Sequence, residues 1–184
     1  MKDINMVLWE AAWAGNIERI KTSIESGADI NKRSIGDSSP LEAAAYNGQV
    51  EACRLLLEQG ADPNAFAETS GETVLHQVIT KRDDPRRTQI VAALVAAGAD
   101  VNCFTLTNVP TSCFARDIRT RGETPLHRAA AYGDEEMIEA LIQAGADKSA
   151  KDAYGESPLT WASWHLRDDS ILKMLLYGEF VGTL

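Results

Sequence analysis

The 184-residue chain has little of several features that would indicate a particular chemistry. No apolar run approaches the roughly 20 residues that a membrane-spanning helix needs, and no apolar signal segment is present, so we expect a cytoplasmic protein without membrane contact. The three cysteines and three histidines lack the spacing of a structural zinc site. There is no nucleophile motif, phosphate-cradling glycine loop or paired catalytic carboxylate, so we expect no enzymatic activity, no cofactor and no metal.

Positive charge is also scarce. The chain has 18 Lys and Arg against 27 Asp and Glu, a formal net charge of −9. Such a chain repels nucleic-acid phosphates, so we expect a protein partner and no nucleic acid. The cysteines, Cys53, Cys103 and Cys113, are odd in number, and we expect free thiols in a reducing compartment. A disulfide bond between Cys103 and Cys113 is the alternative.

Two short phrases do recur along the chain, and they alternate. The copies of Gly-Ala-Asp each follow an apolar run of helical period, and they end at Asp29, Asp62, Asp100 and Asp147. The copies of a Ser/Thr-Pro-Leu-His phrase have their leucines at Leu41, Leu75, Leu126 and Leu159. Where nothing is inserted, each phrase returns after about 33 residues, which indicates a repeat protein.

Each phrase has a local structural role. Ser39 and Thr124 are expected to cap helices, and the proline that follows each of them stands where its missing N–H is no loss. Glu42 completes a capping box with Ser39. The glycine of Gly-Ala-Asp ends the second helix of each unit in the left-handed conformation. These second helices carry an apolar stripe that one unit cannot bury alone, so neighbouring units must stack.

These phrases resemble the ankyrin repeat family over nearly the whole chain. The resemblance implies an all-α ankyrin-repeat solenoid of about five helix-turn-helix repeats with β-turn or hairpin fingers, in a single domain spanning residues 1–184. The expected repeats are residues 5–33, 34–66, 67–104, 119–151 and 152–184, with an inserted finger at 105–118 between repeats three and four. It also implies that His76 and His127 are structural imidazoles that bind neighbouring turn backbone.

Two insertions depart from the repeat. The longer one, between Asp100 and Gly122, is rich in apolar residues, and we expect an ordered finger that either packs on its own repeat or contacts a partner. The shorter one adds Lys81 to Arg87 between two helices. Together they concentrate basic residues on an acidic chain. This charge either solubilises an exposed loop or forms a basic lip for an acidic partner surface.

The resemblance also implies where a partner lies, namely across the turn tips and the exposed ends of the first helices. The candidate partner-binding residues are Trp13, Tyr46, Asn47, Phe66, Thr69, Glu72, Lys81, Phe104, Phe114, Arg116, Arg119, Arg121, Tyr132, Tyr154, Trp164 and His165. Among them, Trp13, Tyr46, Tyr132 and Trp164 form an aromatic row at repeat spacing. Aromatic residues are favoured as binding anchors, although each of these rings could instead pack on the next repeat. We expect Trp161 in the core.

The sequence therefore favours a monomeric protein–protein interaction module that binds a folded partner through its concave face and fingers. One alternative is a cytoplasmic inhibitor or immunity-type protein that blocks a toxin or enzyme, and another is a scaffold or assembly protein. A further alternative is an enzyme that uses His165 with Asp168 as an acid–base pair. This alternative is not favoured, because both are expected to be surface residues near a helix end.

Overall fold

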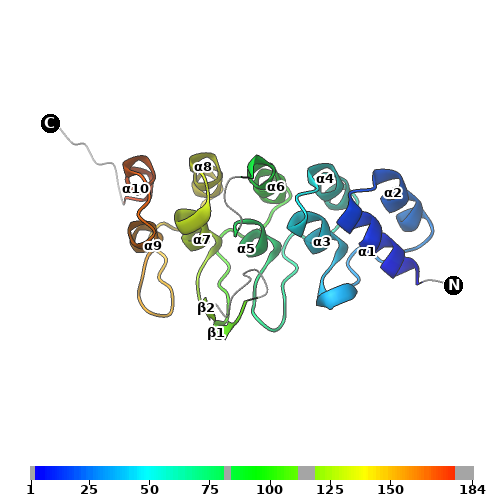
Figure 1. Cartoon of the computed structure of the whole chain (residues 1–184), viewed down its shortest axis with the longest axis horizontal. Coiled ribbons are helices and arrows are strands. Elements are labelled where there is room, and N and C mark those ends of the chain that lie inside the picture. The colour runs from blue at the N-terminus through cyan, green and yellow to red at the C-terminus, as the bar shows by residue number, and fades with distance from the viewer. Residues whose placement is uncertain (1–2, 81–83, 112–118, 177–184) are drawn as a thin grey trace.

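The computed structural model describes residues 3–80, 84–111 and 119–176, and in these residues ten α-helices stack as five antiparallel pairs (Figure 1). The first helices of the pairs are α1 (Ile4–Ala14), α3 (Pro40–Tyr46), α5 (Val74–Val78), α7 (Pro125–Tyr132) and α9 (Pro158–Trp164). The second helices are α2 (Ile17–Glu25), α4 (Val50–Glu58), α6 (Pro85–Ala96), α8 (Glu135–Gln143) and α10 (Asp169–Leu175). The structure confirms the predicted all-α repeat solenoid.

The pairs form two helical layers with a row of turns below them. The second helices make the upper layer of Figure 1, the first helices make the lower one, and the turns between repeats project beneath. One of these turns contains the 3₁₀ helix η1 (Ile35–Asp37). We call the surface formed by the first helices and these turns the groove face, and the outer surface of the second helices the back face.

The first helices begin where the repeated phrase predicts, because side chains satisfy their first amides. Ser39 and Glu42 form the expected capping box before α3. Thr73 caps α5 and Thr124 caps α7, each paired with the histidine three residues later. Thr73 has no proline after it, yet α5 still begins at the next residue, so the Thr-His pair suffices to start the helix.

The core is a continuous row of apolar side chains between the two layers. Leu41, Leu75 and Leu126 of the repeated phrase are at most 1% exposed, and the stripe of the second helices packs against them. Asparagine side chains tie successive turns together. Asn31 accepts from the Asp62 amide at 2.9 Å, and Asn64 and Asn102 accept in the same way from the aspartates of their next repeats, while Asn5 makes the same bond to Asp29 within the first repeat.

The longer insertion contains the two strands among the described residues. β1 (Thr107–Pro110) pairs antiparallel with β2 (Arg119–Arg121), and their register slips between Thr107 and Pro110. This slip places one extra residue in β1, where Asn108 has a φ of 60° in the left-handed region. The hairpin projects below α5 and α7, in the row of turns (Figure 1).

Residues 84–87 of the shorter insertion cap and open a helix, whereas residues 81–83 lie outside the part of the chain that the structure describes. Asp84 caps α6 and Pro85 opens it, so Arg86 and Arg87 belong to its first turn. The expectation that Arg87 is a solvated or partner-facing cation is wrong, because its side chain is 3% exposed. It donates to the carbonyl oxygens of Ala45 and Tyr46, at the end of α3. Arg87 therefore satisfies the unpaired end of a neighbouring helix.

Candidate functional site

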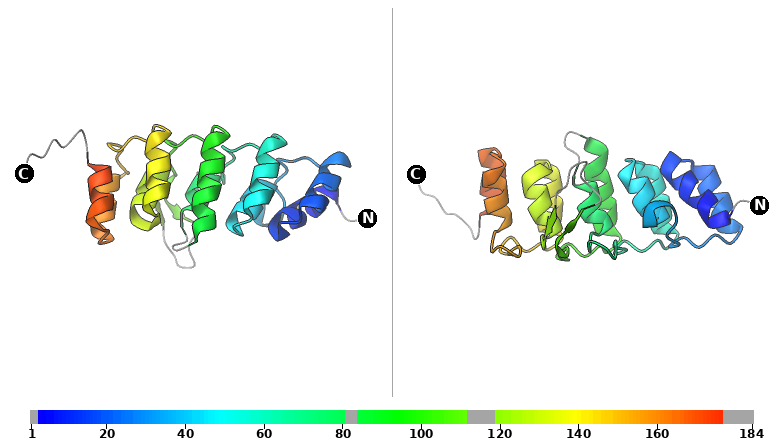
Figure 2. Two further views of the ribbon diagram at one scale, coloured as in Figure 1. Left: turned by 90° about the horizontal axis from the view of Figure 1, so that it is seen from above. Right: turned by 60° about the horizontal axis from the view of Figure 1, so that its bottom comes forward.

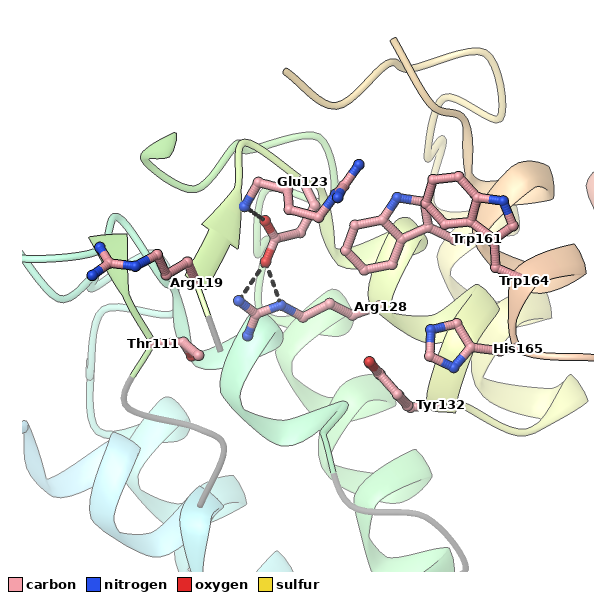
Figure 3. Close-up of a pocket in the computed structure, with 9 residues that line it drawn as sticks. Thr111, Arg119, Glu123, Arg128, Tyr132, Trp161, Trp164 and His165 are labelled. Atoms are coloured by element: carbon pink, nitrogen blue, oxygen red, sulfur yellow. Dashed lines mark hydrogen bonds and ion pairs between the residues drawn. The ribbon is translucent and has the colours of Figure 1, made fainter. Parts of the chain in front are cut away.

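Two hollows lie on the groove face. The N-terminal hollow has a volume of about 520 Å³ and is lined by Trp9, Trp13, Ile35, Asp37, Tyr46 and Thr69 among others. The C-terminal hollow has a volume of about 190 Å³, and Figure 3 shows the residues that line it. Most of its lining comes from three parts of the chain. The strand β2 contributes Arg119 and Arg121, Glu123 precedes α7, and α7 itself contributes Arg128 and Tyr132. The last part is α9 with Trp161 and Trp164, followed by His165.

Three stacked rings form one wall of the N-terminal hollow. Trp9 and Trp13 lie one helical turn apart on α1, with ring centroids 5.3 Å apart, and Trp13 stacks on Tyr46 of α3 at 5.8 Å. Trp9 is buried, whereas Trp13 and Tyr46 are each 40% exposed. The stack fixes the rings of Trp13 and Tyr46 while leaving part of each on the surface, as in a rigid aromatic anchor.

The C-terminal hollow has a second aromatic cluster, built around an arginine. The guanidinium carbon of Arg121 lies 4.2 Å from the centroid of the Tyr154 ring and 5.5 Å from that of Trp164. Its Nε donates to Asp152 at 2.8 Å. Burial alone would raise the pKa of Asp152, but the Arg121 bond and backbone amides lower it, so the carboxylate stays charged. Nearby, Tyr132 meets His165 edge to face at 4.8 Å.

The floor of this hollow is a buried ionic network. Arg128 Nη2 lies 2.7 Å from Glu72 Oε1, and Arg128 Nε donates to Glu123 Oε1 at 2.9 Å, as Figure 3 shows for Glu123. All three side chains are at most 3% exposed. Burial raises the pKa of Glu72, but the charge of Arg128 and hydrogen bonds from Thr111, Arg128 and Ser70 outweigh it and lower the pKa to about 2. The carboxylates are therefore ionised and paired.

The histidines of the repeated phrase are structural, as the resemblance implies. His76 Nε2 pairs with the carbonyl oxygen of Glu123 at 3.1 Å, and His127 Nε2 pairs with that of Glu156 at 3.0 Å. Burial lowers the pKa of His76 to about 3, and burial also lowers that of His127. Both rings are neutral at pH 7, and each joins its repeat to the next turn.

The inserted hairpin contacts the turns on both of its sides. The amide of Leu106, just before β1, donates to the Ser70 carbonyl in the third repeat at 2.8 Å. On the other side, the amide of Ala153 in the fifth repeat donates to the Arg121 carbonyl at 2.8 Å. Thr111, just after β1, donates to Glu72. The hairpin is thus fixed to the solenoid beside the C-terminal hollow.

The structure brings most of the predicted binding residues to the groove face. Trp13, Tyr46 and Thr69 line the N-terminal hollow, while Arg119, Arg121, Tyr132, Trp164 and His165 line the C-terminal one. Phe66, Phe104 and Tyr154 lie outside both linings and are 54%, 54% and 59% exposed. Asn47 is half-buried and donates to the Trp13 carbonyl at 2.8 Å. Lys81, Phe114 and Arg116 lie outside the described residues, as does Cys113.

One predicted contact is wrong, and other residues were missed. Glu72 was expected at an exposed turn tip, but it is 0% exposed because Arg128 holds it beneath the hairpin. Trp161 is 7% exposed, which confirms its expected place in the core. Sequence reasoning missed Trp9 and Arg128. The spacing of four between Trp9 and Trp13 could have shown that the two rings stack on one helix face.

Comparison with known proteins agrees with this architecture. The family described as ankyrin repeats (3 copies) matches residues 8–105 and 107–183. The chain is an ankyrin-repeat protein. Repeats of this family generally mediate protein–protein interaction, so the family points to a protein partner.

Several curated proteins contain similar segments. This ankyrin-repeat chain is 36% identical to human Rabankyrin-5 over 90 residues, covering 48% of the chain and 7% of that protein. It is 40% identical to the Xenopus tropicalis neurogenic locus notch homolog protein 1 over 81 residues, covering 44% of the chain and 3% of that protein. It is 27% identical to the bovine mitochondrial disaggregase over 172 residues, covering 94% of the chain and 22% of that protein. The chain thus spans under a quarter of each.

The described residues contain no helix that is long and apolar enough to cross a membrane. They also contain no group of three or more His, Cys, Asp or Glu side chains placed to hold a metal ion. The polar network beneath the C-terminal hollow is built from an arginine and two carboxylates that bind one another.

Proposed function

We propose that this ankyrin-repeat protein binds a folded protein partner through its groove face, with the turns and the inserted hairpin taking part. The observation that carries the proposal is the exposure of four aromatic side chains on the groove face. Trp13 and Tyr46 at one end of the face and Trp164 and Tyr154 at the other are between 40% and 59% exposed. Large exposed rings beside hollows are typical of the anchors that dominate binding energy.

The aromatic side chains are also held in place before any partner arrives. Trp13 is stacked on Trp9, and Tyr154 lies against the guanidinium of Arg121. Ordering a free side chain on binding costs about 0.5–1.5 kcal/mol, so rings that are already ordered lose less on association. The groove face therefore supports tight binding without rearrangement of the solenoid.

The test is affinity capture from the native source, followed by binding measurements on the purified partner. Trp13→Ala and Trp164→Ala should each weaken binding by tenfold or more, as expected for central aromatic anchors worth about 2 kcal/mol. Arg54→Ala is the matched control, because Arg54 is exposed on α4 of the back face. Unchanged affinity in both tryptophan variants, with the fold intact by circular dichroism, would exclude the groove face.

The same captured partner separates the alternatives. An inhibitor or immunity-type protein would abolish the activity of one tightly bound partner. A scaffold would recruit two partners at once or associate with itself in sizing experiments. A simple interaction module would bind the partner without abolishing its activity, without recruiting a second partner and without self-association.

A further inference from the structure

The charged side chains that line the C-terminal hollow differ sharply in burial. Glu123 and Arg128 form its floor, are 3% and 1% exposed, and pair with each other. Arg119 is exposed and the Arg121 side chain is 33% exposed. Within the described lining, the charges that remain in contact with solvent are therefore both positive, on a chain whose net charge is −9.

The two arginines lie on the same side of their strand. Side chains two residues apart in a strand point to the same face, about 7 Å apart along it. Thr120 between them points the other way, is 2% exposed, and donates to the Val109 carbonyl of β1.

The two guanidinium groups nevertheless diverge from the strand. Arg119 Nη1 donates to the Asn108 carbonyl oxygen at 2.9 Å, and its side chain points away from Trp164 (Figure 3), whereas the Arg121 guanidinium lies over the Tyr154 ring. Arg119 therefore contributes positive charge at the rim of the hollow, and Arg121 lies beside Trp164.

Arg121 is held in a fixed position while its terminal nitrogens stay available. Arg121 Nε donates to Asp152, whose side chain is fully buried. The Arg121 guanidinium group lies over the Tyr154 ring and close to the Trp164 ring. In the part of the chain that the structure describes, no hydrogen bond engages its two Nη groups. The N–H groups of these two nitrogens can form a bidentate pair with a carboxylate without first being ordered.

We propose that the C-terminal hollow binds an acidic side chain of the protein partner, carried beside an apolar side chain. The carboxylate pairs with Arg121 and is attracted by Arg119, while the apolar neighbour packs on Trp164. The volume of about 190 Å³ accommodates one such apolar group. This proposal rests on the proposed function and names the partner's chemistry at one end of the groove face.

Blocked tripeptides provide the first test. Acetyl-Leu-Glu-Phe-amide should shift the indole N–H signal of Trp164 in NMR titrations, with the signal assigned by its loss in Trp164→Phe. Acetyl-Leu-Gln-Phe-amide, which has the same shape without the charge, should bind about tenfold more weakly, because a charge-assisted bond is about twice as strong as a neutral one. Equal binding of the two peptides, a preference for acetyl-Leu-Lys-Phe-amide, or no shift at millimolar peptide would each overturn the proposal.

A charge reversal then locates the effect. Arg119→Glu should remove the preference for the glutamate peptide over the glutamine peptide, whereas Arg54→Glu, the same change on the back face, should leave it intact. Arg121→Lys keeps the charge without the fork and should lower the preference by severalfold. Circular dichroism confirms that each variant is folded, and a preference that survives Arg119→Glu contradicts the proposal even if Arg121 variants are unstable.

The salt dependence of peptide binding distinguishes pairing with the two arginines from the effect of the net charge of the chain. The acidic chain as a whole repels an acidic peptide, so binding governed by net charge would strengthen as salt is added. Pairing with Arg119 and Arg121 predicts that binding weakens between 10 mM and 200 mM salt. If the captured partner depends on Trp13 but the peptides fail all of these tests, the protein-binding function stands and the acidic-ligand proposal is wrong.

Discussion

Replacing Arg128 by methionine should destabilise the fold by about 3–5 kcal/mol at pH 7, the usual cost of removing one partner from a buried ion pair. Arg128 is 1% exposed and bonds to Glu72, to Glu123 and, through Nη1, to the His76 carbonyl at 2.9 Å. Methionine fills much of the same space but donates nothing. Two carboxylates and a carbonyl would be left buried without their shared partner.

The pKa of Glu72 gives an independent magnitude. It is lowered from 4.5 to about 2 in the folded chain, which corresponds to about 3 kcal/mol at 1.36 kcal/mol per pH unit. Because the folded pKa is depressed, this stability is fully present above pH 4.5 and is lost as the pH falls through 2. In Arg128→Met, burial should raise the pKa of Glu72 instead, so the two proteins should converge in stability at acidic pH.

The assay is urea unfolding followed by circular dichroism at several values between pH 7 and pH 3. Arg86→Met is the matched control, because Arg86 pairs with Asp84 at the surface and its side chain is 58% exposed. An exposed pair contributes about 0–1 kcal/mol. A loss in Arg128→Met no larger than that of the control, or one that stays constant down to pH 3, would refute the account of the buried network.

Three further predictions follow from buried or constrained positions. Arg87→Met should lower the free energy of unfolding in urea by about 2–4 kcal/mol, because it leaves the Ala45 and Tyr46 carbonyls at the end of α3 unpaired. The exposed control Arg86→Met should lower it by under about 1 kcal/mol, and equal losses in the two variants would contradict the role of Arg87. Gly71→Ala should destabilise more than Gly27→Ala by thermal unfolding, because both have positive φ but only the former meets main chain of the insertion, at 2.9 Å. His76 should keep the NMR shifts of a neutral ring from pH 8 to pH 5, because burial lowers its pKa in the folded chain to about 3. The unfolded chain binds this proton near pH 6.5, so the stability of the fold should decrease as the pH drops below about 6.5. A His76 ring that titrates near pH 6.5 would be inconsistent with its burial.

The fold was predictable because its signals are local and repeated. The Ser39–Glu42 capping box and the Thr-Pro-Leu-His helix starts operate within four residues, so the sequence alone identifies them. The burial of Leu41, Leu75 and Leu126 follows from stacking of equivalent positions. A repeat protein is favourable for such prediction because each unit contacts mainly its neighbours.

The charged network was not predictable, because its partners are distant in sequence. Arg128 and Glu72 are 56 residues apart, and Arg87 reaches a carbonyl 42 residues before it. Arginine and glutamate are normally exposed, so a turn-tip Glu72 was the reasonable expectation. Glu72 is covered by the longer insertion, in which Thr111 donates to its carboxylate, and the repeat pattern contains no information about an insertion.

The aromatic row was predicted as a set of positions but not as two clusters. The repeat spacing placed Trp13, Tyr46 and Trp164 on one face, and the structure adds that Trp9 supports the first pair while Arg121 supports the last. These supports require side-chain directions that spacing does not specify.

The most direct test of the account is the affinity of the captured partner for Trp13→Ala and Trp164→Ala compared with Arg54→Ala, measured by isothermal titration calorimetry on folded proteins. Binding through the groove face predicts a loss of at least tenfold for each tryptophan variant and no change for the back-face control. Full affinity in both tryptophan variants would contradict the account, and a loss in Arg54→Ala would then place the partner on the back face.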